Sequence, residues 1–263
     1  MPQPSLHVVP IPAPIQHASF DLMATLSESL RSSEEALLEG DVLAISSKYV
    51  AISQGRMVLL DSVEVSNEAA EMASRYHMDA RVAQLVLQEA EHVLGGIQLG
   101  YALTAQHGII AANAGIDRSN IPAGYAVLLP TTPYQTAAKI RQALRVQSGQ
   151  DIGVVLTDSW LMPGRLGTIG IAVASAGFSP IIDERGQLDL FANPMAVTQR
   201  GIADAISTCA QMVMGERDEA TPFAIVRNSG VVLCDDDITA ADVAIPWHQC
   251  LYIESLTTGR WKI

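Results

Sequence analysis

The stretch GVVLTDSWLMPGRLGTIGIAVASAGF, residues 153–178, indicates the fold class of this 263-residue chain. It begins with an apolar run at 154–156, of the kind that a buried strand needs. The run ends at Thr157-Asp158-Ser159, and a loop with a proline and two glycines leads to a second apolar run at 169–173. Open α/β sheets bind ligands at the carboxyl ends of their strands, so Asp158 and Ser159 are candidate site residues. The alternative is that Asp158 only begins a turn.

Outward from this stretch, short apolar runs alternate with helical patterns, which predicts an α/β fold with mixed sheets. Expected strands lie at 6–9, 41–47, 50–60 with a break at Gly55, 97–104, 108–112, 126–129, 180–183 and 223–227. Expected helices lie at 19–38, 66–75, 79–94, 132–146 and 195–214, with Asp79 as an N-cap and Gly215 as a stop. No low-complexity linker divides the chain. We therefore expect one domain over residues 1–263, with a helical subdomain inserted at about 66–95.

The composition argues against several classes of function. Hydrophobic residues make up 49% of the chain and charged residues 17%, which is typical of a globular protein. The net charge of −12 argues against a nucleic-acid backbone as partner. It suits metal ions, although a solvated acidic face is the more common cause. No run reaches the roughly 18 apolar residues of a membrane span, and the N-terminus lacks a signal-peptide pattern, so we expect no membrane partner.

The cysteines and histidines give no metal or redox signature. Cys209, Cys234 and Cys250 are odd in number and scattered, without metal-ligand spacing. We interpret them as reduced thiols and expect a cytoplasmic location. His77 and His92 also lack metal-ligand spacing and are interpreted as surface or packing residues.

Four polar clusters follow apolar elements along the chain. They are Lys48, the loop with Asp117 and Asn120, the pair Asp158-Ser159, and the run that begins at Glu216. Carboxylates and a hydroxyl suit hard cations, and two such cations beside a lysine suit phosphoryl transfer. The common phosphate-binding signatures, G-x-x-x-x-G-K-[ST] and G-x-G-x-x-G, are absent. Spacing alone leaves the simpler alternative open, since acidic residues at strand ends occur in many α/β proteins.

Longer motifs surround these clusters and carry a family resemblance. They are the NAGID loop at 113–117 with Ser119 and Asn120, LTDS at 156–159 with Pro163, Arg165 and Gly170, the segment 183–189, and VMGE at 213–216. In this order and spacing they resemble the γ-glutamyl ligase family of the deazaflavin coenzyme F420. The resemblance covers about residues 9–227, and the segment after Asn228 lies outside it.

The resemblance implies a fold, a reaction and partners. The implied fold is that of the F420 γ-glutamyl ligases, as an intertwined homodimer. The implied reaction joins L-glutamate to the carboxylate of the F420 precursor, using GTP and two divalent cations, Mg²⁺ or Mn²⁺. An acyl phosphate is the implied intermediate, because a carboxylate must first acquire a leaving group before an amine can displace it.

The resemblance also implies roles for individual residues. Asp117 and Asp158 would hold one cation, and Ser159 and Glu216 the other. The alternative for Glu216 is an exposed residue after a helix stop. The implied nucleotide contacts are Ala13, Pro14, Ile15, Gln16, Ser47, Lys48, Asn120, Met214, Gly215, Glu216, Arg217, Asp218, Glu219, Ala220 and Thr221.

The chain departs from the family pattern near these motifs. Ile52 and Gln54 stand where many members place lysine and glutamate, and Trp160-Leu161-Met162 follows Ser159 in place of Phe-Gly-Arg. Ile52 and the MGE-x-DE form resemble a branch described as folate γ-glutamate ligases. Two alternatives therefore stay open: γ-glutamylation of folate or another pterin-like acid, and a nucleotide- and metal-binding protein that does not catalyse ligation.

Overall fold

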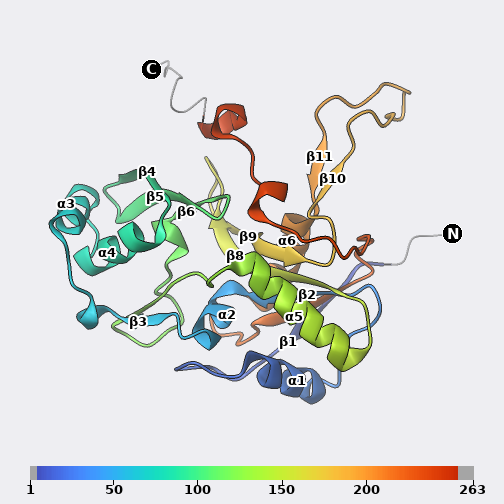
Figure 1. The fold of residues 1–263 in the computed structure, drawn as a ribbon, viewed down its shortest axis with the longest axis horizontal. Coiled ribbons are helices and arrows are strands. Elements are labelled where there is room, and N and C mark those ends of the chain that lie inside the picture. Colours follow the sequence, from blue (N-terminus) through green and yellow to red (C-terminus); the bar gives the residue numbers. More distant parts are fainter. Residues whose placement is uncertain (1–4, 254–263) are drawn as a thin grey trace.

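The computed structural model describes residues 5–253 and has a mixed five-stranded sheet at its centre (Figure 1). The strand order is β1 (His7–Ile11), β12 (Phe223–Arg227), β2 (Val42–Ser46), β8 (Gly153–Leu161) and β9 (Thr168–Ala176). β2 and β8 run parallel, and the other neighbouring pairs of this sheet are antiparallel. The mixed α/β class predicted from the sequence is confirmed.

Helices cover both faces of the central sheet. On one face, α1 (Leu22–Ser32) and α5 (Pro133–Ser148) pack into the core that contains Leu43 and Ile45. On the other face, α6 (Ile202–Met214) packs into the core that contains Val42 and Ala44. Successive residues of a strand point to opposite faces, so a strand covered on both faces must be apolar throughout. This explains the continuous apolar run of β2.

Local sequence signals set several helix ends. The Asp21 carboxylate accepts a hydrogen bond from Ala24 N, and α1 therefore begins at Leu22. Pro133 occupies the first turn of α5, where its missing N–H costs nothing, and Gly149 ends that helix with a φ of 71°. These ends are encoded by residues adjacent to the helix itself.

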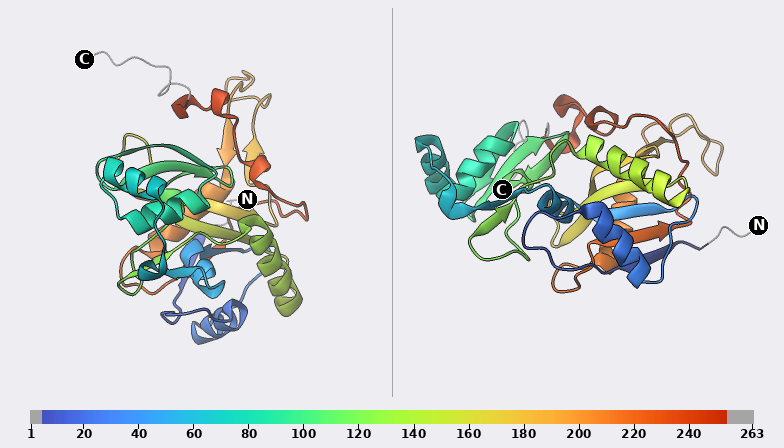
Figure 2. Two further views of the ribbon diagram at one scale, coloured as in Figure 1. Left: turned by 60° about the vertical axis from the view of Figure 1, so that its left-hand side comes forward. Right: turned by 60° about the horizontal axis from the view of Figure 1, so that its bottom comes forward.

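A second, smaller core lies beside the central sheet (Figure 2). α3 (Asn67–Tyr76) and α4 (Ala80–Glu89) pack with an antiparallel sheet of β4 (His92–Ile97), β5 (Tyr101–Gln106) and β6 (Ile109–Ala112). β3 (Met57–Leu59) pairs with β7 (Tyr125–Val127) where the chain enters and leaves this region. The Asp79 side chain accepts from Arg81 N, which confirms the expected N-cap of α4.

The prediction of an extended segment over 50–60 is wrong. Residues Ser47–Ser53 form the helix α2, and only Met57–Leu59 pair as a strand. The Ser46 side chain caps this helix by accepting from Tyr49 N. Short apolar runs do not distinguish a buried helix from a buried strand, so the sequence pattern could not separate the two.

The helix predicted over 19–38 spans only Leu22–Ser32, and two further predicted helices are also shorter than expected. The helix predicted over 79–94 ends at Glu89, because His92–Ile97 pair with β5. The helix predicted from residue 195 begins only at Ile202. The residues before it form β11 (Gln199–Gly201), which pairs with β10 (Ile181–Asp183) at the base of a hairpin. In both places strand pairing overrides the local helical pattern.

Residues 229–253 are mostly loop, as expected, with the short turns η3 (Ala240–Asp242) and η4 (Trp247–Gln249). Arg141 of α5 anchors the start of this segment by donating to Asp235, while also donating to Asp151 and to the carbonyl oxygen of Ile152. Farther along, the Trp247 ring lies edge-on to His92 of β4. The segment thus contacts both cores. In the part of the chain that the structure describes, no helix has the length and apolarity to cross a membrane.

Substitution of Gly170 in β9 tests the packing of α6 on the central sheet. An added Cβ would collide with the backbone of Ser207 in α6. We expect Gly170→Ala to lower the free energy of unfolding by about 1–3 kcal/mol, because helix and strand would have to separate. Gly95→Ala is the control, since its Cβ would have no neighbour within 4 Å, and we expect a change within about 0.5 kcal/mol. Equal urea midpoints for the two variants would show that the close approach is not needed.

Candidate active site

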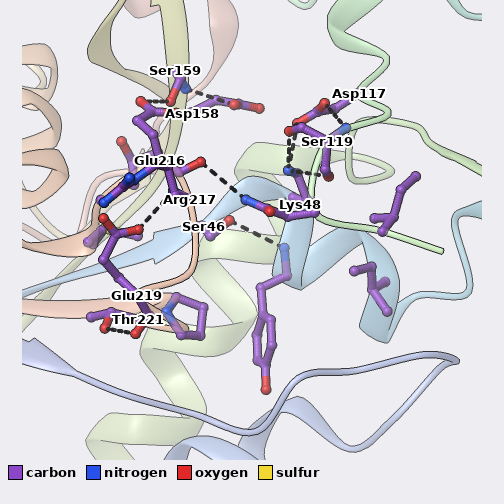
Figure 3. A pocket seen from close by; sticks show the side chains of 18 of the residues that line it. Ser46, Lys48, Asp117, Ser119, Asp158, Ser159, Glu216, Arg217, Glu219 and Thr221 are labelled. Carbon is purple, nitrogen blue, oxygen red and sulfur yellow. Dashed lines mark hydrogen bonds and ion pairs between the residues drawn. The ribbon is translucent and has the colours of Figure 1, made fainter. Parts of the chain in front are cut away.

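A cleft of about 1000 Å³ lies where the central sheet meets the smaller core. β2 and β8 are parallel, so their carboxyl ends open at the same edge, and Ser46, Lys48, Asp158 and Ser159 all line the cleft there. The facing wall comes from the loop after β6, with Asp117 and Ser119 (Figure 3). Segments far apart in the sequence therefore meet in one hollow.

β8 extends beyond the point where the sequence predicted its end. Its last partner on β2 is Ser46, opposite Thr157, yet β8 continues to Leu161 paired only with β9. A register shift lies between Leu156 and Thr157, at the point where the strand leaves the sheet. Such irregularities re-aim side chains beside functional sites. Asp158 and Ser159 consequently lie on the part of β8 that extends past its pairing with β2 and pairs only with β9.

Asp158 has few partners for a half-buried carboxylate. Ser47 Oγ donates to Asp158 Oδ2 and Ser159 N donates to Asp158 Oδ1, at 2.5 and 2.7 Å. Burial raises the pKa of Asp158 to about 6, and these hydrogen bonds only partly oppose the rise. The carboxylate is therefore held in place but is poorly compensated in charge.

Asp117 is held by a short polar network. Lys48 Nζ lies 2.6 Å from Asp117 Oδ2 and donates to the carbonyl and hydroxyl oxygens of Ser119. Ser119 in turn donates from N and Oγ to the Asp117 carboxylate. Burial alone would raise the pKa of Asp117, but Lys48 and Ser119 outweigh it and keep the pKa below its ordinary value. Lys48 thus ties α2 to the loop of the smaller core.

Glu216 lies just after α6 and closes a third side of the cleft. Ser159 Oγ donates to Glu216 Oε1 at 2.5 Å, and Gln211 of the last helical turn donates to both. Asn120 Nδ2 donates to the carbonyl oxygen of Glu216 at 3.2 Å. The residues from three sequence motifs therefore contact one another directly.

The segments 13–16 and 214–221 meet at the far end of the cleft. Ala13 N donates to the carbonyl oxygen of Ala220. The Tyr49 hydroxyl donates to the carbonyl oxygen of Pro14 and accepts a hydrogen bond from Gln16 Nε2. Within the second segment, Glu219 accepts from Arg217 N, and Thr221 Oγ1 donates to the carbonyl oxygen of Glu219. The two segments form one continuous wall.

Every sequence-predicted site residue but one lines this cleft. The exception is Ser47, which is 1% exposed and lies behind Asp158. The sequence analysis assigned no role to several lining residues, among them Tyr49, Tyr101, Ile116, Trp160, Thr168 and Gln211. Gln211 had a usable signal, because it lies one helical turn before the predicted stop at Gly215. The position of Tyr101 depends on the pairing of β5, which no local pattern specifies.

The oxygen atoms around the cleft fit hard divalent cations. Asp117, Asp158 and Glu216 supply carboxylates, and Ser159 supplies a hydroxyl, with no sulfur or imidazole among them. Within residues 5–253, no group of three His, Cys, Asp or Glu side chains forms a ligand cluster by itself. Mg²⁺ is usually held by one or two carboxylates together with substrate phosphates. The site therefore fits cations that arrive with a phosphorylated ligand better than cations held by protein alone.

Substitution of Asn113 tests which contacts hold the loop that carries Asp117. It adopts a φ of 51°, its Oδ1 accepts from Ala102 N and its Nδ2 donates to the carbonyl oxygen of Gly100. We expect Asn113→Ala to lower the free energy of unfolding by about 1–3 kcal/mol, since it leaves these groups unpaired and strains the backbone. Asn113→Gly loses the same hydrogen bonds without the strain, so its loss should be smaller. Unchanged urea midpoints for both variants would contradict this role.

Comparison with known proteins assigns the family. A family model described as F420-0:gamma-glutamyl ligase matches residues 10–228. A coenzyme F420:L-glutamate ligase of Methanopyrus kandleri is 36% identical over 227 residues, covering 85% of this chain and 87% of the relative. Proteins of the same name from Methanothermobacter thermautotrophicus and Methanocaldococcus jannaschii are 33% and 34% identical, covering 81% and 73% of this chain and 85% and 77% of their own lengths. The chain belongs to the F420-0:gamma-glutamyl ligase family.

Proposed function

We propose that this protein adds L-glutamate to the carboxylate of the F420 precursor and forms a glutamyl amide. GTP is the proposed phosphoryl donor, and Mg²⁺ or Mn²⁺ the proposed cations. The observation that carries the proposal is the convergence of three of the four family motifs, NAGID, LTDS and VMGE, on one cleft, in a chain matched by the family model over residues 10–228. The fourth motif, the segment 183–189, lies in the β10–β11 hairpin. The relatives named as coenzyme F420:L-glutamate ligases support the same reaction.

The charge of the cleft supports the need for cations. Its lining contains five carboxylates, from Asp117, Asp158, Glu216, Asp218 and Glu219, against the side chains of Lys48 and Arg217. A nucleoside triphosphate is itself an anion and would be repelled by this excess of negative charge. Bound divalent cations would neutralise the phosphate oxygens and reverse that repulsion. Nucleotide binding should therefore depend strictly on the metal.

The proposed roles follow from the contacts. Asp117 and Asp158 would hold one cation, and Ser159 and Glu216 the other. Ser47 is buried behind Asp158, so its role is to orient that carboxylate and not to touch the nucleotide. Lys48 pairs with Asp117 in the structure, and a cation on that carboxylate would leave the ammonium free to face a phosphate.

The nucleotide would lie against the wall formed by 13–16 and 214–221. This wall carries exposed polar residues and backbone groups, with Asn120 linked to it through Glu216. Its position beside the three carboxylates would bring the terminal phosphate to the centre of the cleft. A volume of about 1000 Å³ is at the upper end for a single small ligand, so a second substrate can lie beside the nucleotide.

The proposed chemistry has two displacements. A carboxylate oxygen of the acceptor attacks the γ-phosphorus of GTP, and the bond to the β-phosphate oxygen breaks to release GDP. The amino nitrogen of L-glutamate then attacks the acyl carbon of the acyl phosphate. Inorganic phosphate leaves and the amine loses its proton to solvent. The protein contributes mainly positioning and charge compensation.

Mass spectrometry of the reaction products tests this function. The protein is incubated with Mn²⁺, GTP and L-glutamate, and with the F420 precursor or a reduced folate in separate tubes. We expect a gain of glutamyl units on the deazaflavin, formation of GDP, and no product when Mn²⁺ is replaced by a chelator. A gain on the folate alone would identify the other acceptor. Nucleotide binding without any product would indicate a protein that no longer ligates.

Asp158→Asn tests the metal assignment. It removes one negative charge and almost no volume, so we expect more than about a hundredfold loss of turnover. In chelator, the variant should unfold at the same temperature as the parent or higher, because a poorly compensated buried charge is gone. Thermal stabilisation by Mn²⁺ and nucleotide should be lost. Asp61→Asn, an exposed site paired with Arg81, is the control and should keep activity. Full turnover in Asp158→Asn would contradict the assignment of Asp158 as a metal ligand.

We also propose that the protein is a homodimer. The β10–β11 hairpin projects from the body, as Figure 1 shows; three residue pairs join its strands, and isolated backbone hydrogen bonds such as Gly186 N to the Met195 carbonyl oxygen continue toward its tip. Its tip exposes Leu190 and Phe191, at 100% and 85% of their surface. A paired hairpin is marginally stable alone, and apolar side chains exposed together mark interaction surfaces. A second copy of the chain covering the tip would account for both features.

Substitution at the hairpin tip tests the dimer. We expect the parent to sediment as a dimer and Phe191→Asp to sediment as a monomer, because a charge would be buried at the contact. Val146→Asp is the matched control, since Val146 is also exposed, at 76%, but lies on α5. Analytical ultracentrifugation of the three proteins decides the question. A monomeric parent, or a dimeric Phe191→Asp variant, would contradict this use of the hairpin.

A further inference from the structure

The cleft has two chemically different ends, separated by the carboxylates of Asp117, Asp158 and Glu216. The end formed by 13–17 and 214–222 carries the charged side chains of Arg217, Asp218 and Glu219. The other end, on the side of β5 and β6, is lined by Tyr101, Ala112, Gly115, Ile116, Trp160 and Leu161, and these described residues include no charged side chain. The two ends would therefore favour different parts of the reactants.

Trp160 is fixed across the gap between the two cores. It follows Ser159 on the projecting part of β8, and its indole Nε1 donates to the carbonyl oxygen of Ile110 in β6 at 2.8 Å. The ring is only partly buried and borders the cleft. One edge of the indole is thus anchored by a hydrogen bond, which limits the entropy lost when a ligand packs on it.

The aromatic side chains at the two ends differ in availability. Tyr101 of β5 is 46% exposed and lines the cleft, and β5 pairs with β6, the strand to which Trp160 is hydrogen-bonded. Tyr49 lines the cleft too, but it is 8% exposed and packs against Phe20 and Phe223. Of the Phe, Tyr and Trp residues described along the cleft, only Tyr101 and Trp160 therefore offer an open ring surface.

The geometry of phosphoryl transfer assigns these rings to a substrate. The attacking and leaving oxygens must lie on opposite sides of the transferred phosphorus. With the nucleotide against the charged end, the acceptor carboxylate must approach from the aromatic end. We infer that Trp160, together with Tyr101, is the platform that binds the planar heteroaromatic ring of the acceptor acid. This inference rests on the function proposed above.

Matched substitutions at Trp160 test the platform. Trp160→Leu and Trp160→Phe both lose the hydrogen bond to Ile110, but only the leucine variant loses an aromatic face. Stacking on an aromatic side chain changes affinity by about fivefold to a hundredfold or more, so we expect the leucine variant to raise the KM for the deazaflavin acid by about tenfold or more. The phenylalanine variant should stay within about threefold of the parent. The KM for GTP should be the same in all three proteins.

Tyr101 provides a second, independent variant. Its side chain is exposed, so Tyr101→Leu should fold normally and raise the KM for the deazaflavin acid, whereas Tyr101→Phe should not. Trp247→Leu controls for loss of a tryptophan elsewhere, because Trp247 lies beside His92 and outside the cleft. It should leave both KM values unchanged. Equal KM values for the leucine and phenylalanine variants, or a change confined to GTP, would overturn the platform while leaving the ligase function standing.

Direct binding separates this inference from the proposed function. Isothermal titration of the F420 precursor or a reduced folate, with Mn²⁺ and GDP present, measures ring binding without turnover. Binding that weakens in Trp160→Leu but not in Trp160→Phe supports the platform even where the parent forms no glutamyl product. Absence of binding of either acid to the parent protein overturns the platform. Binding that is equal in the parent and in Trp160→Leu does the same.

Discussion

The parallel pairing of β2 with β8 is the constraint on which the site depends. Two parallel strands run toward the same edge, so Lys48, which follows β2, and Asp158, which follows the last residue of β8 that pairs with β2, must lie close in space although they are far apart in sequence. Cores on both faces fix this pair, because sliding either strand by one residue would move each side chain into the opposite core and disrupt the packing of both. The rigid pair therefore sets the geometry of the cleft.

Around this edge, negative charge is concentrated and only partly compensated. Lys48 forms an ion pair with Asp117, whereas Asp158 is held by a hydroxyl and a backbone N–H and has no direct ion pair with any residue of 5–253. A structure that served stability alone would pair or remove such a carboxylate. The imbalance is consistent with a site completed by cations and phosphate, and it links the electrostatics of the cleft to the function proposed for it.

The contacts between the two cores give the cleft its walls. Lys48 reaches the Asp117 loop, Asn120 reaches Glu216, and the Trp160 indole reaches β6. Each is a polar contact between elements that belong to different cores, and Lys48 alone contacts both Asp117 and Ser119. In the segment after residue 228, Asp235 accepts a hydrogen bond from Arg141 of α5, and the Trp247 ring packs against His92 of β4. Relative movement of the cores would therefore change the site directly, because the site residues are also the connecting residues.

Local patterns along the chain were enough to predict the α/β class, most strand positions, several helix ends and most of the polar residues that line the cleft. Apolar runs, caps such as Asp79 and motifs such as NAGID act locally, and local signals can be read without a structure. Only the tertiary structure decided that Ser47–Ser53 is helical, that β8 continues to Leu161, and that Ser47 lies behind Asp158. It also decided that Tyr101 and Trp160 border one end of the cleft. These features depend on strand pairing and packing between distant segments, and no residue's neighbours in the sequence specify them.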